Sequence, residues 1–147
     1  MKSFHAGPML YFAEVVANQM YKHRDCLVVL ARGFSVPKIT ASFLHTKFSM
    51  PRTTLKYSPY LIFLLNFDES DFNSLQIDMQ HLQKRSPAQQ IGLTQLTQKD
   101  LLKRNELFLR GGVYAVTYKQ LVVDLLCKKI SPLIITGVIV NQAHTAD

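Results

Sequence analysis

The feature that most constrains the fold of this chain is a set of short, mostly apolar runs separated by longer amphipathic stretches. The runs cover residues 27–31, 60–66, 113–116 and 134–140. They are rich in Val, Ile, Leu and Phe, which is typical of strands buried on both faces of a parallel sheet. None approaches the roughly 20 residues that a membrane-spanning helix needs. The runs therefore predict four buried strands.

The stretches between the runs place apolar residues at helical spacing. They predict helices over 9–21, from Pro37 onward, 68–80, 97–104 and 119–129. Pro37 suits a first helical turn, with Ser35 or Val36 ahead of it, and Thr97 with Asp100 resembles a capping box. Alternating strands and helices predict an α/β fold in which helices cover both faces of a parallel sheet.

Charge and cysteine content narrow the functional classes. The 147 residues carry a formal net charge of +7, which favours polyanionic partners such as nucleic acid. Hydrophobic residues make up 48% of the chain, and this excludes a disordered composition. Cys26 and Cys127 fit neither a disulfide framework nor a zinc site, so we expect two small buried side chains in a protein of a reducing compartment.

Several segments resemble the XPF-type DNA repair endonucleases. Residues 111–126 read GGVYAVTYKQLVVDLL and residues 130–144 read ISPLIITGVIVNQAH. They are similar to the GG-strand, the LVVDLL helix and the ITG-strand with its AH pair in that family. Residues 27–33, LVVLARG, look like the family's first core strand. The resemblance implies a RecA-like sheet, with residues 1–147 forming part of the first helicase-like lobe and the nuclease and helix-hairpin-helix domains absent.

In an active lobe of this kind, a glycine-rich loop and an Asp-Glu pair would hold ATP and magnesium. When the loop pattern is aligned on Gly33, its second glycine falls on Lys38 and only Thr40 matches. The Asp-Glu pair is replaced by Asn141 and Gln142, which keep the shape without the charge. We therefore expect no ATP hydrolysis. The degenerate nucleotide site comprises Gly33, Lys38, Thr40, Asn141, Gln142 and His144.

Candidate DNA contacts follow from the same resemblance. In the related helicases the loop after residues 113–116 touches the nucleic-acid backbone, which implies contacts from Thr117 and Lys119. The two residues fit equally well a helix cap followed by an exposed lysine. Nearby basic residues are either a DNA-facing patch or a solvated helix face. The candidate set is Lys103, Arg104, Arg110, Thr117 and Lys119.

The resemblance implies a nuclear, non-catalytic segment of a structure-specific endonuclease that acts in nucleotide excision repair. The chain itself is predicted to lack catalytic residues, metal ligands and a cofactor, whereas the family's later nuclease domain uses a divalent metal such as Mg²⁺. The implied partners are DNA at junctions of duplex and single strand, a smaller homologous subunit and a scaffold protein, with no membrane. Two alternatives stay open: a stand-alone RecA-like binding module and an active ATP-dependent helicase lobe.

Overall fold

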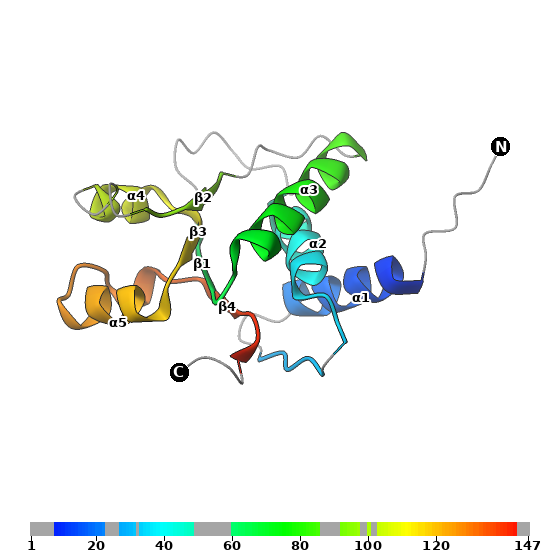
Figure 1. Ribbon diagram of the computed structural model, residues 1–147, viewed down its shortest axis with the longest axis horizontal. Helices are drawn as coiled ribbons and strands as arrows, with labels where there is room; N and C mark the ends of the chain where they lie inside the picture. Colours follow the sequence, from blue (N-terminus) through cyan, green and yellow to red (C-terminus); the bar gives the residue numbers. More distant parts are fainter. Residues whose placement is uncertain are drawn as a thin grey trace. The chain divides into compact units, whose positions relative to one another are not determined.

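The computed structural model describes residues 8–22, 27–31, 33–48, 60–85, 92–97, 100 and 103–143. These residues contain five α-helices and one four-stranded parallel sheet, an α/β fold consistent with a RecA-like arrangement (Figure 1). The predicted fold class is thereby confirmed. No helix among the described residues is long and apolar enough to cross a membrane.

The chain divides into two compact units. The first comprises Met1–Pro51 and Asp71–Gln90, and holds α1 (Pro8–Lys22), α2 (Val36–Phe48) and most of α3 (Glu69–Arg85). Helix α2 packs against α1 and is buried at nearly every position from Pro37 to Leu44. The Ser35 hydroxyl oxygen accepts a hydrogen bond from the Lys38 N–H at 3.4 Å. This confirms the expected helix start, with Pro37 in the first turn.

Residues 27–31 correct one prediction. They are not part of any strand, and the side chains of Leu27 and Val29 are 89% and 83% exposed. The expected first core strand is therefore wrong, because an apolar run becomes a strand only where a neighbouring strand satisfies its backbone. Cys127 corrects another, since it is exposed rather than buried, while Cys26 lies outside the described residues.

The second unit comprises Arg52–Ser70 and Ile91–Asp147 and contains the sheet. Its strands are β1 (Leu61–Leu65), β2 (Leu93–Gln95), β3 (Gly112–Val116) and β4 (Gly137–Val140), in the order β2-β3-β1-β4. Every pair is parallel, with Leu61 opposite Gly112 and Ile62 opposite Gly137. The predictions over 60–66 and 113–116 correspond to β1 and β3. The predicted strand over 134–140 is confirmed only from Gly137 onward, as β4, since Pro132–Ile134 form a short 3₁₀ helix.

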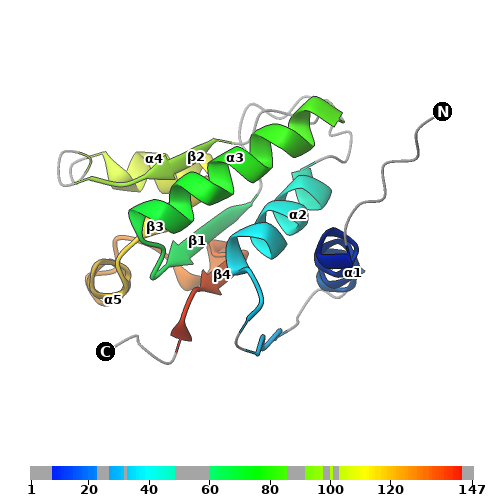
Figure 2. The ribbon, with the colours of Figure 1, turned by 45° about the vertical axis from the view of Figure 1, so that its right-hand side comes forward.

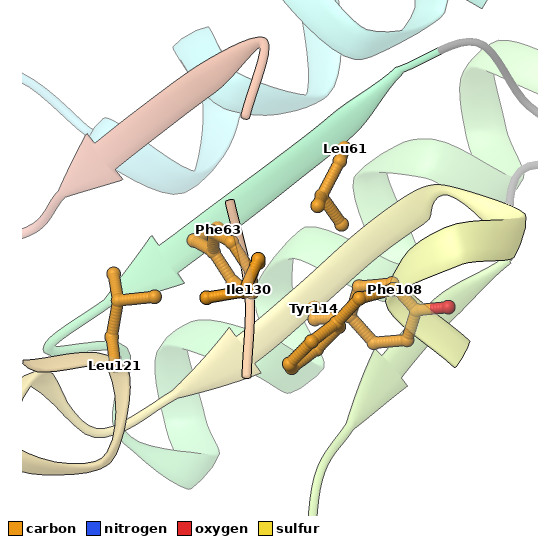
Figure 3. Packing of buried hydrophobic residues seen from close by; sticks show 6 residues of the cluster. All are labelled: Leu61, Phe63, Phe108, Tyr114, Leu121 and Ile130. Carbon is orange, nitrogen blue, oxygen red and sulfur yellow. The ribbon is translucent and has the colours of Figure 1, made fainter. Parts of the chain in front are cut away.

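One face of this sheet is covered by α4 (Arg104–Arg110) and α5 (Tyr118–Leu126). The core cluster consists of Leu61, Phe63, Phe108, Tyr114, Leu121 and Ile130 (Figure 3). The Phe108 ring meets those of Phe63 and Tyr114 edge to face, with ring centres 5.2 and 5.4 Å apart. The buried Tyr114 hydroxyl lies 2.9 Å from the Leu107 carbonyl oxygen, which ties the end of α4 to β3.

The connection from β2 to α4 differs from the predicted helix over 97–104. Thr97 and Asp100 form a turn, in which the Asp100 carboxylate accepts from the Thr97 N–H at 2.9 Å and from its hydroxyl at 2.8 Å. Helix α4 begins at Arg104, where the predicted helix was to end. Gly111 and Gly112 then join α4 to β3 with φ angles of 72° and 130°, which favour glycine.

Candidate nucleic-acid interface at the carboxyl edge of the sheet

The carboxyl ends of β1, β3 and β4 meet at one edge of the sheet, because all three strands are parallel (Figure 2). The residues directly after them are Asn66, Thr117 and Asn141. All three are polar and follow apolar strands. Ligands of open α/β sheets bind at this edge, beyond the carboxyl ends of the strands, so it is the first place to examine for binding.

Thr117 forms the N-cap of α5. Its hydroxyl oxygen accepts a hydrogen bond from the Gln120 N–H at 3.2 Å, with the backbone extended at φ −76° and ψ 148°. The cap interpretation is thereby confirmed. A hydroxyl that accepts from an N–H still has its own hydrogen to donate. Thr117 is exposed, so the cap is compatible with donation to a phosphate, which stays a prediction.

Lys119 lies in the first turn of α5 and is exposed. Its Nζ atom is 5.6 Å from the centre of the Tyr118 ring, within the range of a cation–π contact. The first N–H groups of a helix and its dipole favour an anion at this end. Thr117, Tyr118 and Lys119 therefore bring a hydroxyl donor, an aromatic ring and a positive charge to one helix terminus.

The basic residues at the two ends of α4 are separated by the fold. Lys103 is exposed and immediately precedes α4, in the segment that leaves the carboxyl end of β2. It therefore lies on the same side of the sheet as Thr117. Arg110 ends α4 and comes just before β3. A five-residue strand is about 16 Å long, so Arg110 lies near the opposite edge of the sheet.

Arg104 corrects the predicted set. Its side chain is 5% exposed, and its Nη1 atom lies 3.3 Å from Oδ2 of Asp124, whose side chain is 2% exposed. The Gln120 side-chain amide also donates to Asp124, at 3.4 Å. A buried guanidinium that is paired with a carboxylate is not presented to a phosphate. We therefore remove Arg104 from the candidate DNA contacts.

The predicted degenerate nucleotide site has residues in both units. In the first unit Gly33 has a φ of 98°, Lys38 is exposed, and Thr40 is 2% exposed. Thr40 is the fifth residue of α2, whereas a phosphate loop presents its Ser or Thr where the helix begins. This placement is unlike that of a magnesium ligand.

The second half of that site lies at the end of β4. The Asn66 side-chain amide donates to the carbonyl oxygens of Asn141 at 2.9 Å and Gln142 at 3.3 Å. The Asn141 N–H donates to the Leu65 carbonyl oxygen at 3.0 Å. Gln142 has a φ of 46°, which a non-glycine residue rarely adopts. His144 lies outside the described residues. The degenerate site as a whole stays a prediction.

Two residues of this region were not singled out from the sequence. Asn66 is the polar residue that ends the apolar run at 60–65. A polar residue directly after a buried strand is a candidate for ligand binding, and this pattern could have identified Asn66 from the sequence. Asp124 is a lone carboxylate within the apolar segment LVVDLL. An acidic residue in such surroundings is rarely buried without a partner. The sequence pattern therefore predicts that Asp124 forms an ion pair, but it does not identify Arg104 as the partner.

Comparison with known proteins gives one relative. The chain is 31% identical over 136 residues to the DNA repair protein rad16 of Schizosaccharomyces pombe, an alignment that covers 91% of this chain and 14% of the relative. The chain thus spans a small part of the length of the protein that it matches. No protein-family model and no solved structure matches it.

Proposed function

We propose that this chain is a helicase-like, ATPase-inactive segment of an XPF-type DNA repair endonuclease, and that it contributes DNA or partner binding rather than catalysis. The observation that carries the proposal is the alignment to the DNA repair protein rad16, which covers 91% of the chain at 31% identity. The parallel sheet with polar residues after its strands supports a helicase-like lobe. The buried Thr40 and the Asn141–Gln142 pair support the loss of ATPase activity.

The activities of the complete protein are part of the proposal. A later nuclease domain with a divalent metal such as Mg²⁺ would cut DNA at junctions of duplex and single strand during nucleotide excision repair in the nucleus. A smaller homologous subunit and a scaffold protein would be its partners. The present chain would supply binding and positioning at such a junction.

The DNA contacts proposed for this chain are made to phosphates. Lys103 and Lys119 would each neutralise one phosphate, and the Thr117 hydroxyl would donate to another. All three lie on the carboxyl side of the sheet and are exposed. Contacts of this kind position a protein on DNA without reading its sequence, and they make the affinity strongly dependent on salt.

The DNA contacts are tested by fluorescence anisotropy with a labelled splayed duplex, over salt concentrations from about 50 to 200 mM. Replacing Lys103 and Lys119 with Gln should weaken binding and reduce the slope of log K against log salt by about 1.4–1.8, or roughly 0.7–0.9 per lost contact. The matched control replaces Lys128 and Lys129, which are exposed in the same unit. An equal change in both double variants would contradict the assignment.

The loss of ATPase activity is tested separately. A phosphate-release assay with ATP and Mg²⁺ should show no hydrolysis above the background without protein. Hydrolysis together with tight ATP binding would instead support the alternative of an active helicase lobe.

The stand-alone alternative is tested by the size of the endogenous protein, detected with an antibody to residues 111–147. A band several times larger than 16.8 kDa supports the endonuclease proposal, and a single band near 16.8 kDa supports a stand-alone binding module.

A further inference from the structure

Helix α5 has apolar side chains on its buried face and also on the exposed face beside it. On the inner face Leu121 is buried in the core cluster, and Leu125 packs against that cluster. On the outer face Val122, Val123 and Leu126 are 48%, 48% and 77% exposed. These three positions fall within an arc of about 100° on a helix with 3.6 residues per turn. A surface helix ordinarily has one apolar stripe, which faces the core. The exposed aliphatic side chains of α5 therefore require an explanation.

The surroundings of this outer face are positively charged. Lys128 and Lys129 are exposed and follow α5 directly. Their backbone positions are fixed, because the Lys128 N–H donates to the Leu125 carbonyl at 3.1 Å and the Lys129 N–H donates to the Asp124 carbonyl at 2.9 Å. This is the hydrogen-bond pattern of a Schellman motif. The two lysines therefore begin two residues after Leu126, in a defined backbone conformation.

Acidic residues are scarce along α5 and the segment that follows it. The sequence from 118 to 136 contains a single carboxylate, Asp124, and this residue is buried against Arg104. We call Val122, Val123, Leu126, Lys128 and Lys129 the α5 outer face. These five described residues present aliphatic side chains and positive charge to solvent.

We propose that the α5 outer face binds an acidic amphipathic helix of a partner protein. Aliphatic side chains on one face of a helix fit the i, i+3, i+4 anchors of a helical ligand, and the lysine pair fits carboxylates that flank those anchors. Nucleic acid is a poorer fit, because bases stack on aromatic rings rather than on Val and Leu. The inference rests on the proposed binding role of the chain but not on its DNA contacts.

The chemistry of the ligand is tested by selection from a random library of helical peptides of about 16 residues. The 147-residue chain is the target, and the Val122→Thr, Leu126→Gln variant is used for counter-selection. We expect enrichment of peptides with apolar residues at helical spacing and an excess of Asp and Glu. Enrichment of basic peptides, or of none, would overturn the proposal.

The role of the lysines is tested by charge exchange with an enriched peptide. Lys128→Glu with Lys129→Glu should weaken its binding at least tenfold, and exchanging the acidic residues of the peptide for Lys should restore binding to that variant. Lys38→Glu, at an exposed position of α2, is the control and should leave the peptide affinity unchanged. Equal peptide affinity for the unmodified chain, the Lys128→Glu, Lys129→Glu variant and the Lys38→Glu variant would refute the assignment.

Three further measurements separate this proposal from others. The Val122→Thr, Leu126→Gln variant should retain the DNA affinity of the unmodified chain, so that loss of DNA contacts and loss of peptide binding are distinguished. Circular dichroism should show that its fold is intact, since only exposed residues change. Binding to phosphatidylserine vesicles without binding to any peptide would assign the α5 outer face to a lipid surface and overturn the proposal.

Discussion

The ion pair between Arg104 and Asp124 allows the sharpest test of the packing of α4 against α5. The atoms Nη1 and Oδ2 are 3.3 Å apart, and both side chains are almost fully removed from water. The Nε atom of Arg104 is buried without a hydrogen-bond partner among the described residues. Removing either charge therefore leaves its partner buried and uncompensated.

The expected magnitude follows from two opposing contributions. At an effective dielectric constant of about 20, charges 3.3 Å apart attract by about 5 kcal/mol. The loss of hydration on burial costs several kcal/mol for each ion. The intact pair therefore contributes little net stability relative to apolar side chains. Breaking it by Asp124→Ala or Arg104→Met should cost about 3–5 kcal/mol, whereas Arg104→Met combined with Asp124→Leu should lie within about 1 kcal/mol of the original chain.

The assay is urea unfolding followed by circular dichroism, with the free energy of unfolding obtained by linear extrapolation. Glu106→Ala, at an exposed position on the same helix, is the control and should change the free energy by less than about 0.5 kcal/mol. The reasoning is refuted if the single variants cost less than about 1 kcal/mol, or if the double variant costs as much as the two single variants together.

Three further predictions concern local structure. Lys128→Gly should raise the free energy of unfolding by about 0.5–1 kcal/mol, since Lys128 has a φ of 54°, and urea unfolding measures this. Thr117→Ala should lower the free energy of unfolding by about 1 kcal/mol, because the hydroxyl that accepts from the Gln120 N–H is lost. Thr117→Ser keeps a hydroxyl and should lower it by less. The Thr97 N–H, followed by its hydroxyl, holds the pKa of Asp100 below its usual 3.8. The turn is therefore favoured above that pH and weakens as the pH falls through the lowered pKa; an NMR titration should show a higher Asp100 pKa in Thr97→Ala.

The strands that were correctly predicted from the sequence are those whose apolar runs find a neighbouring strand in the sheet. Residues 60–66 and 113–116 are almost wholly apolar, and they form β1 and β3. Residues 27–31 have the same composition but are exposed. Strand formation depends on a partner as well as on propensity, and the partner is a long-range property that a local pattern does not contain.

The elements that were missed are short. Strand β2 has three residues, of which Leu93 is the apolar one, and α4 has seven. Segments of this length contain too little periodicity to indicate a strand or a helix. The same limit applies to the site. Thr117 and Lys119 were found because a strand and a helix flank them, whereas the burial of Arg104 depends on Asp124, 20 positions away in the sequence.

The position of β1 in the sheet has a consequence for synthesis of the protein on the ribosome. Both neighbours of β1 come later in the chain, β3 about 50 residues and β4 about 75 residues after it. At translation rates of about 5–20 residues per second, the segment LIFLL waits roughly 3–10 s for its first partner and longer for its second. During that interval its apolar side chains and its unpaired backbone groups are both open to other chains. We therefore expect β1 to be a binding site for chaperones on the nascent chain.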